Sequence, residues 1–280
     1  MMKPYFQENN FILYYGDALT IIDQLDNDEV RFDLIYVDPP YFLSNNGITC
    51  QSGKMVSVNK GDWDKSEGFE DDVNFIDSWL KECRTVLKEN GSILVSGTLH
   101  NIYKVGYLLE KNDYDIINDI IWYKPNAPPN LSCKYFTHSH EIVLWARKSK
   151  NSHHIFNYEK MKFWNNPKDK LKNKDKQMRS VWSIPLIPKA EKEFGKHPTQ
   201  KPMELLNRII TSSSNDGDLV LDPFVGSGTT GVVCNLLNRK FIGIDTSKDY
   251  LDLAIKRFRD TKSKELLFYP KAKNQITKFI

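Results

Sequence analysis

Short apolar runs alternate with longer amphipathic stretches along most of the chain, and this alternation strongly restricts the fold. Seven of the runs have the length and the β-branched, aromatic or leucine-rich composition of buried strands. These runs are Phe11–Tyr15, Leu34–Val37, Ser92–Ser96, Ile116–Trp122, Glu141–Ala146, Leu219–Leu221 and Phe241–Ile244. The clearest helix candidates are Asp72–Leu87, Met203–Ile210, Thr230–Leu237 and Tyr250–Phe258. Alternating strands and helices predict a doubly wound α/β fold, in which helices cover both faces of a mostly parallel, seven-stranded sheet.

The composition restricts the class of protein further. A chain of 280 residues with 40% hydrophobic side chains suits one domain over residues 1–280, with an insertion. The four cysteines, Cys50, Cys83, Cys133 and Cys234, lack the spacing of metal ligands. We therefore expect reduced thiols in a cytoplasmic protein, and no metal. Neither a signal-peptide pattern nor a bilayer-spanning apolar stretch is present, so no membrane association is expected. The net charge of +3 excludes a polycation, so a nucleic-acid surface would have to be local.

The stretch RFDLIYVDPPYFLS, from Arg31 to Ser44, ends an apolar run with an acid, two prolines and an aromatic ring. Because two prolines cannot continue a regular element, Asp38-Pro39-Pro40-Tyr41 predicts a rigid turn at a strand end. Taken alone, this tetrapeptide fits an ordinary strand-terminating turn as well as a functional site.

The stretch LVLDPFVGSGTTGVV, from Leu219 to Val233, predicts a strand, a glycine-rich turn and the start of a helix. Gly226 and Gly228 allow a sharp turn and a close approach of the backbone to a ligand. We expect Thr229 and Thr230 to cap the helix, whose first N–H groups point outward. Such a loop at a strand end predicts a ligand site, although a plain glycine turn is the alternative.

Asp245 ends the next strand, roughly 20 residues after the glycines, where an acid commonly holds ribose hydroxyls. The glycine spacing is neither G-x-G-x-x-G nor the phosphate loop, which argues against a dinucleotide and against a nucleoside triphosphate. A nucleoside with an amino-acid tail fits better. Asp222 would then face the ammonium group of the tail, while loop N–H groups would bind its carboxylate.

Together, Asp38–Tyr41 and Asp222–Thr230 resemble the two motifs of DNA amino-methyltransferases that use S-adenosylmethionine. The tetrapeptide precedes the glycine loop, which resembles the β-class, whose sheet is circularly permuted at the sequence level. KHPTQKPMELL, from Lys196 to Leu206, also matches this class. DPPYFLSNNGITC, VSVNKGDWDK, NLSCKYFTHSHEIVLWARK and GKHPTQKP are similar to the second adenine methyltransferases of DpnII-type restriction systems, which modify GATC and accept single-stranded DNA.

The resemblance implies a Rossmann-like methyltransferase sheet with an inserted DNA-recognition segment. Residues 1–147 would form the catalytic half, 148–196 the target-recognition insertion and 197–280 the cofactor-binding half. Asp17 resembles the acid that meets the cofactor adenine, although it could also cap a helix over 18–25. Lys201 and Pro202 resemble residues near the methionine end of the cofactor, although Pro202 is also a good first helical residue. The implied cofactor residues are Asp17, Asp38, Lys201, Pro202, Asp222, Phe224, Gly226, Ser227, Gly228, Thr229, Thr230 and Asp245.

The implied reaction is methyl transfer to the exocyclic N6 amine of an adenine flipped out of its helix. The lone pair of this amine is delocalised, so two acceptors at its N–H bonds would make it more nucleophilic. We assign these roles to the Asp38 carboxylate and the Pro39 carbonyl, held rigidly with Pro40, while Tyr41 would stack on the base.

Three alternatives remain open. Cytosine-N4 methylation uses the same chemistry, although those relatives often have serine where Asp38 stands. Protein-glutamine and RNA-base methyltransferases normally carry Asn-Pro-Pro-Tyr and place the cofactor loop first. A non-enzymatic DNA-binding protein is disfavoured because Asp38, Tyr41 and Asp245 are intact.

Lysines and aromatic residues crowd the 148–196 segment, which predicts phosphate contact, although a solvated lysine-rich loop is the plain alternative. We expect the loops around 46–65 and 126–141 to contribute as well, with Asn126, Asn130 and Tyr135 lining the base pocket. The expected DNA contacts are Lys54, Lys60, Lys134, His138, Lys168, Lys170, Lys172, Lys174, Lys176 and Arg179. The partner is double-stranded DNA, with single-stranded DNA as a second substrate by resemblance. The resemblance also implies a companion restriction endonuclease without a stable complex, and it allows a homodimer.

Overall fold

The computed structural model describes residues 2–44, 48–51, 54–57, 64–195 and 197–264. The strands are β1 (Phe6–Glu8), β2 (Phe11–Tyr15), β3 (Phe32–Val37), β4 (Ile48–Gln51), β5 (Lys54–Ser57), β6 (Leu87–Gly97), β7 (Asp115–Tyr123), β8 (His140–Arg147), β9 (Val181–Ser183), β10 (Leu219–Asp222) and β11 (Lys240–Asp245). The helices are α1 (Ala18–Asn27), α2 (Phe69–Val86), α3 (Ile102–Lys111), α4 (Tyr158–Lys162), α5 (Met203–Ser213), α6 (Thr229–Leu236) and α7 (Lys248–Lys264).

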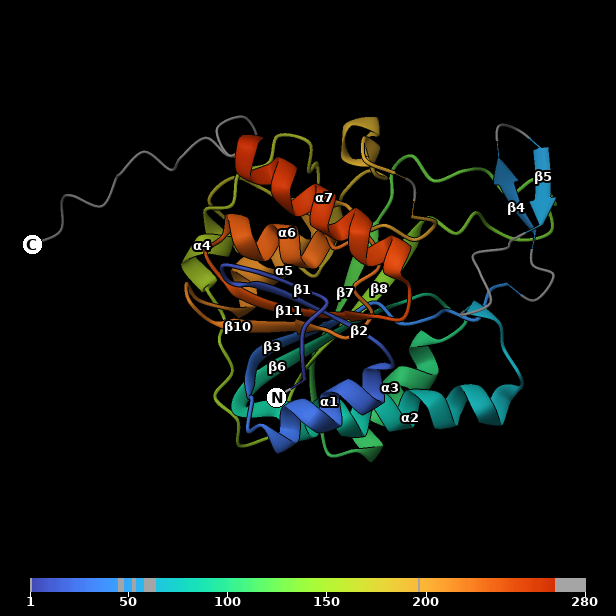
Figure 1. The fold of residues 1–280 in the computed structure, drawn as a ribbon. Helices are drawn as coiled ribbons and strands as arrows, with labels where there is room; N and C mark the ends of the chain where they lie inside the picture. Colours follow the sequence, from blue (N-terminus) through green and yellow to red (C-terminus); the bar gives the residue numbers. More distant parts are fainter. Residues whose placement is uncertain (1, 45–47, 52–53, 58–63, 196, 265–280) are drawn as a thin grey trace, which may run out of the picture.

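One sheet organises the molecule, with the strand order β1-β2-β11-β10-β3-β6-β8-β7-β9 (Figure 1). All seven predicted strands are present in it. The pairings from β2 through β11, β10 and β3 to β6 are parallel, whereas β8 runs antiparallel to both β6 and β7. Within the described residues the sheet has nine strands, because two short edge strands, β1 and β9, extend the predicted seven. Three residues are too few for a periodic pattern to reveal such strands.

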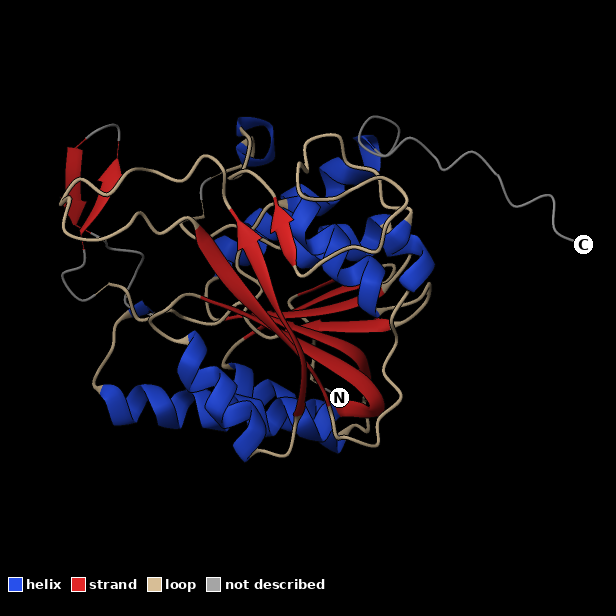
Figure 2. Ribbon diagram, turned by 180° about the vertical axis from the view of Figure 1, so that it is seen from behind, coloured by secondary structure: helices blue, strands red, loops and turns tan. Residues whose placement is uncertain are grey.

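Helices cover both faces of this sheet, which confirms the predicted doubly wound fold (Figure 2). Helices α1, α2 and α3 lie on one face, and α5, α6 and α7 lie on the other (Figure 1). The central strand β3 explains why two layers form, since its alternate residues point to opposite faces. Ile35 and Val37 belong to one apolar cluster, and Leu34 and Tyr36 belong to the other.

The sheet order brings segments from the two ends of the chain together. Strand β10 pairs with β3 on one side and β11 on the other, although residues 38–218 separate β3 from β10. The register sets Leu221 beside Ile35, so the residues after β10 and β3 emerge at the same edge. The order of the strands reverses between β10 and β3, and ligands bind at such switch points.

The segment between β8 and α5 packs against α5 and contributes an edge strand. Its carboxylate Asp169 forms a buried ion pair with Arg208 of α5. At the C-terminal end of α5, the Asn157 amide donates to the carbonyls of Thr211 and Ser214. Within the described part of the chain, no helix combines the length and apolar character needed to cross a membrane.

Candidate active site

A cavity of about 290 Å³ opens at the switch point of the sheet. Its walls come from the ends of β2, β3, β10 and β11, from the helices that follow β2 and β10, and from the segment before α5. The lining includes Gly16, Asp17, Tyr36, Asp38, Pro40, Phe75, His197, Thr199, Gln200, Lys201, Asp222, Phe224, Gly226, Ser227, Thr229, Thr230, Asp245 and Ser247. The two sequence motifs therefore open into one cavity, although they lie far apart along the chain.

The glycine loop turns sharply into α6, as its sequence predicts. Gly226 and Gly228 have φ angles of +48° and +75°, which favour glycine. A Cβ atom on Gly228 would lie 2.5 Å from the Cβ of Ala254, and one on Gly226 would lie 2.9 Å from Nε2 of His197. Glycine is therefore required here by backbone conformation and by close packing against α7 and the segment before α5.

The predicted threonine caps of α6 are wrong. Gly228 occupies the N-cap position, and no side chain caps this helix. The Thr230 hydroxyl donates instead to the Asp222 carboxylate, and Thr229 receives a hydrogen bond from Arg257. The left-handed turn at Gly228 carries the chain into the helix one residue earlier than expected. The first backbone N–H groups of α6 are therefore not satisfied by a capping side chain.

Three acids at strand ends border the cavity. Asp245 accepts from the backbone N–H groups of Gly226 and Ser247, both at 2.8 Å, and so ties the glycine loop to the end of β11. Asp17 caps α1 by accepting from the Thr20 N–H at 3.0 Å, and it also lines the cavity, so the two predicted roles are compatible. Each carboxylate oxygen has a second lone pair, which leaves Asp17 and Asp245 able to accept from a ligand.

Asp222 is the most deeply buried of these acids, at 2% exposure. It accepts from the Phe224 N–H and the Thr230 hydroxyl. Burial outweighs these two hydrogen bonds and raises the pKa of Asp222 to about 7. A cation in the cavity would favour the charged form of this carboxylate.

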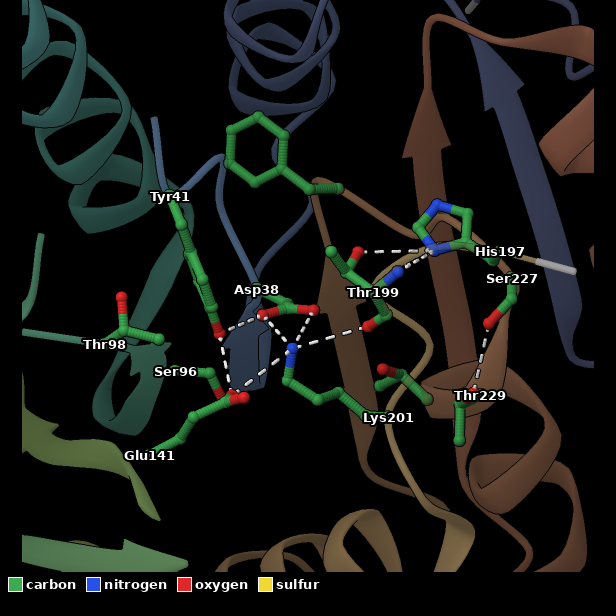
Figure 3. Close-up of polar contacts among 12 residues, drawn as sticks. Asp38, Tyr41, Ser96, Thr98, Glu141, His197, Thr199, Lys201, Ser227 and Thr229 are labelled. Atoms are coloured by element: carbon green, nitrogen blue, oxygen red, sulfur yellow. Dashed lines mark hydrogen bonds and ion pairs between the residues drawn. The ribbon is translucent and has the colours of Figure 1, made fainter. Parts of the chain in front are cut away.

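The Asp38 carboxylate meets the lysine that precedes α5. Nζ of Lys201 lies 2.6 Å from both carboxylate oxygens, and the Tyr41 hydroxyl donates to Asp38 at 2.7 Å (Figure 3). Burial lowers the pKa of Lys201, but the negative charges of Asp38 and Glu141 outweigh it and raise the pKa. The Lys201 ammonium thus stays charged and is held in a fixed arrangement against the Asp38 carboxylate.

Glu141, at the start of β8, is a second carboxylate in this cluster. Its Oε2 lies 3.2 Å from the Tyr41 hydroxyl and 3.7 Å from Nζ of Lys201, and its Oε1 lies 2.9 Å from Nζ of Lys124. Burial, followed by the charges of Asp38 and Glu141, raises the pKa of Tyr41 well above its usual value. Tyr41 therefore stays a neutral hydroxyl between two carboxylates.

Asp64 holds the backbone that follows the catalytic turn. This fully buried carboxylate accepts from the N–H groups of Tyr41, Phe42 and Leu43 and from the Ser44 hydroxyl. Phe42 has a φ angle of +59°, which is unusual for a residue other than glycine. Asp64 thus stabilises an uncommon backbone conformation next to Tyr41.

Several predicted residues do not line the cavity. Pro202 is the N-cap residue of α5 and borders a different cavity, because the chain turns away after Lys201. The Asn126 side chain accepts from the Leu186 N–H, and Asn130 holds its own loop through Ser132 and Tyr135. Neither amide is directed into the main cavity.

The predicted DNA contacts are spread over the surface. Lys134, His138, Lys168, Lys170, Lys174, Lys176 and Arg179 are exposed. Lys172 is half-buried, and its ammonium donates to the Lys162 carbonyl. Lys168 borders a hollow with Pro202, whereas Lys176 and Arg179 border another with Ser212, so the cluster extends along α5. Lys54 lies in β5, and Lys60 lies outside the described residues.

Sequence reasoning missed Glu141, Asp64, His197 and Thr199. Glu141 stands at the start of a run whose apolar residues predict only a buried strand. Asp64 lies within a polar stretch that has no periodicity. His197 contacts Gly226 and the Tyr250 ring, and Thr199 donates its backbone N–H to His197. The motif HPTQKP contained the only signal for these last two residues.

Among the described residues, no group of three or more His, Cys, Asp or Glu side chains could hold a metal ion. The cavity instead combines a buried acid, the first N–H groups of a helix that no side chain caps, and two further acids. This set fits a nucleoside with a cationic amino-acid tail, since the acids match hydroxyl and ammonium groups and the N–H groups match a carboxylate. The fold and the site therefore define an α/β protein whose cavity fits such a ligand beside an Asp-Pro-Pro-Tyr turn.

Comparison with known proteins identifies the family. The model for the family N6_N4_Mtase, described as DNA methylase, matches residues 32–256, and the chain belongs to this family. It is 52% identical over 258 residues to the type II methyltransferase M2.LlaDCHI of Lactococcus lactis subsp. cremoris, which spans 92% of both chains. It is 50% identical to M2.DpnII of Streptococcus pneumoniae, again over 92% of both chains. A solved M1.HpyAVI–SAM complex is 28% identical, covers 88% of this chain and 98% of its own, and superposes with a TM-score of 0.65.

Proposed function

We propose that this protein transfers a methyl group from S-adenosylmethionine to the N6 amine of adenine in DNA. One observation carries the proposal. The Asp38 turn and the glycine loop reach the same cavity from β3 and β10, so a methyl donor on the loop would face an amine acceptor at Asp38. The family assignment and the cofactor complex of the M1.HpyAVI relative support this interpretation.

The chain offers a place for each part of the cofactor. Asp245 would accept from the ribose hydroxyls, and Asp17 would accept from the adenine amine. Asp222 would face the ammonium group, and the first N–H groups of α6 would bind the carboxylate. The remaining members of the expected cofactor set line the cavity, except Gly228, which is absent from its walls, and Pro202, which borders another cavity. Bound S-adenosylmethionine supplies an electrophilic methyl group on sulfur.

The catalytic turn would activate the acceptor amine. Asp38 and the Pro39 carbonyl would accept from its two N–H bonds, which directs the nitrogen lone pair toward the methyl group. Positioning of the two reactants supplies much of the rate, because in-line attack requires close alignment. The buried Tyr41 ring does not line the cavity, so its expected stacking on the flipped base would require the ring to become accessible. Aspartate at position 38, rather than serine, favours adenine over the cytosine-N4 alternative.

We propose GATC as the target, within a type II restriction-modification system. The 50% identity to M2.DpnII and the resemblance of DPPYFLSNNGITC and GKHPTQKP to GATC-modifying enzymes support this assignment. The protein would act in the cytoplasm on double-stranded and also single-stranded DNA. A companion endonuclease would share the target without a stable complex, and a homodimer is compatible with this scheme.

Transfer of a labelled methyl group to short duplexes tests this function. We expect transfer to a duplex that contains GATC, and much less to a duplex of the same composition with that site scrambled. A single strand that contains GATC should also accept the label. Equal labelling of the scrambled duplex would contradict the target, and an absence of labelling in all three DNAs would contradict the function.

We also propose that residues 148–196 serve target recognition, between a catalytic half (1–147) and a cofactor half (197–280). Exposed cations on this segment and on the loop that contains Lys134 and His138 would neutralise phosphates. Replacing Lys168, Lys170, Lys174 and Lys176 together by alanine should flatten the salt dependence of DNA affinity, by about one slope unit for each phosphate that is no longer neutralised. Lys240→Ala, which removes an exposed lysine at the start of β11, is the control. An unchanged slope would mean that these lysines are exposed to solvent and contact no DNA phosphate.

A further inference from the structure

Two carboxylates share one hydroxyl beside the proposed acceptor site. The Tyr41 hydroxyl lies 2.7 Å from Asp38 and 3.2 Å from Glu141, and the Tyr41 side chain is only 4% exposed. Figure 3 shows the hydroxyl between the two carboxylates, with the Lys201 ammonium beside them. A hydroxyl has one hydrogen, so it can donate to only one of these carboxylates at a time. The other carboxylate then faces an oxygen lone pair.

One added proton completes this hydrogen-bond chain. With a proton on Asp38, Asp38 donates to the Tyr41 oxygen, and Tyr41 donates to Glu141. The Tyr41 oxygen then accepts from one acid and donates to the other, while the Lys201 ammonium contacts both acids. The geometry therefore suits a site through which a proton passes.

The proposed reaction releases such a proton. The adenine nitrogen forms a bond to the methyl carbon, while the bond from that carbon to sulfur breaks and leaves its electron pair on sulfur. The nitrogen, now positively charged, loses one proton, and the electron pair of that N–H bond returns to nitrogen. Asp38, as the acceptor at this N–H bond, is the first group that the proton reaches.

Beyond Tyr41, the hydrogen-bonded side chains lie away from the cavity. Asp38 lines the cavity, whereas Tyr41, Glu141 and Lys124 are absent from its walls. The second oxygen of Glu141 meets the Lys124 ammonium at 2.9 Å, and both side chains are 13% exposed. A proton on Glu141 is therefore separated from the reacting nitrogen and lies near solvent.

We infer that Glu141 is a positioning residue that orients the Tyr41 hydroxyl and receives, through it, the proton lost by the methylated amine. The inference rests on the proposed methyl transfer. The proton moves from nitrogen to Asp38, while Asp38 passes a proton to the Tyr41 oxygen and Tyr41 passes its own hydrogen to Glu141. Tyr41 ends as a neutral phenol, and the positive charge has left the base.

Chemical rescue tests the inference on the full-length protein with GATC duplex DNA. Under single-turnover conditions, Glu141→Ala should slow methyl transfer about a hundredfold, the lower end of the range for proton-transfer groups. Acetate should restore much of that rate, whereas chloride at equal ionic strength should not. S-adenosylmethionine affinity should stay unchanged, because Glu141 does not line the cavity.

The double variant Tyr41→Phe/Glu141→Ala separates proton transfer from simple orientation. Phenylalanine keeps the ring but removes the hydroxyl that joins Asp38 to Glu141, so acetate should no longer rescue transfer. Glu141→Gln, which keeps the shape of the side chain, should be slow and insensitive to acetate. Asp119→Ala, an exposed carboxylate on β7, is the matched control and should transfer at the wild-type rate.

Three results would overturn the inference. These are a wild-type rate in Glu141→Gln, an absence of acetate rescue in folded Glu141→Ala, and equal rescue in the double variant. Each requires that the wild-type protein methylates the duplex. Failure of the wild-type protein itself would instead contradict the proposed function.

Discussion

The glycine loop and the catalytic turn both follow central strands, but they are held in different ways. The glycine loop is fixed by groups near it in sequence. Asp222 accepts hydrogen bonds from Phe224 and Thr230, which lie 2 and 8 positions away in the sequence. Asp245 accepts one from Gly226, which lies 19 positions away. The catalytic turn is held from much further along the chain. Lys201 reaches Asp38 from 163 positions away, and Glu141 reaches Tyr41 from 100.

The difference matches what the two loops are proposed to do. The glycine loop can form its ligand surface once β10, β11, α6 and α7 are in place, because its hydrogen-bond partners lie on those elements. The catalytic turn depends on β8, on the segment before α5 and on Asp64, so its geometry is complete only when the whole sheet has formed. We therefore expect that changes around the catalytic turn mainly lower the transfer rate, whereas changes in the glycine loop mainly lower cofactor affinity.

Asp38→Asn should have the largest effect on transfer. It removes the charge of the proposed amine acceptor and keeps its shape, so we expect a loss of about a hundredfold to a thousandfold in the single-turnover rate. Asparagine also keeps an oxygen near Lys201, which limits the destabilisation that an unpaired buried ammonium would cause. Asp23→Asn on the exposed face of α1 is the control. Retention of the wild-type rate would remove Asp38 from the chemistry.

Asp64→Ala should also slow transfer, although Asp64 lines no part of the cavity. The change leaves three backbone N–H groups of residues 41–43 without their acceptor, at a cost of about 1–3 kcal/mol for each that stays buried. We expect the turn to lose its fixed geometry and the transfer rate to fall about a hundredfold, since a misplacement of about 1 Å has such an effect. The measurements are the single-turnover rate and the cofactor dissociation constant.

Asp71→Asn, an exposed acid early in α2, is the control for Asp64→Ala. An equal loss of cofactor affinity and rate in Asp64→Ala would mean that the catalytic turn and the cofactor cavity are not separable.

Gly228→Ala tests the glycine loop, with Gly217→Ala as its matched control. Both glycines have a positive φ angle, +75° and +84°, but only at Gly228 would a Cβ atom clash, at 2.5 Å from Ala254. Both variants bear the cost of backbone conformation, whereas Gly228→Ala adds about 1–3 kcal/mol of overpacking. Thermal unfolding and cofactor titration should show the greater loss in Gly228→Ala. Equal stability and affinity of the two variants would contradict the close packing of α6 on α7.

Asp222 should give cofactor binding a dependence on pH. Because burial raises its pKa to about 7, Asp222 is protonated below that pH in the free protein. Contact with the cofactor ammonium requires the charged form, so affinity should rise with pH toward about 7, by up to about tenfold per pH unit, and then level off. Titration calorimetry should find this slope in the wild-type protein but not in Asp222→Asn. The same slope in both would contradict the assigned contact.

The free energy of unfolding of the free protein should show the opposite dependence on pH, since the contribution of Asp222 to it falls as the pH rises. The pKa of Asp222 is higher in the folded protein than in the unfolded chain, so the contribution of this group is largest at low pH. It is lost as the pH rises through about 7. Asp222→Asn should remove this part of the pH dependence of unfolding.

The comparison also explains what the sequence could predict. The seven strands follow from runs of apolar residues, and the acids Asp222 and Asp245 follow from their places at strand ends beside a glycine turn. These are local signals. The threonine caps failed because the left-handed turn at Gly228 shifted the helix start, which residue preferences alone do not reveal.

Glu141 and Asp64 could not be predicted, because their roles depend on contacts between distant segments. Glu141 is a polar residue at the start of an otherwise apolar run, a place where charged residues commonly face solvent. Only the antiparallel pairing of β8 with β6 brings it to the edge where Asp38 and Tyr41 lie. The role of Asp64 depends on its hydrogen bonds to residues 41–44. The sequence shows Asp64 only as part of a polar stretch.

The identity of the methylated base tests the central claim most directly. A GATC duplex contains adenine and cytosine in one site, so both amines are available as methyl acceptors during incubation with labelled S-adenosylmethionine. Digestion to nucleosides then shows which base carries the label. We predict that the label lies in N6-methyladenosine, in the deoxy form, and disappears with Asp38→Asn. Label in N4-methylcytosine, or unchanged labelling by Asp38→Asn, would contradict this claim.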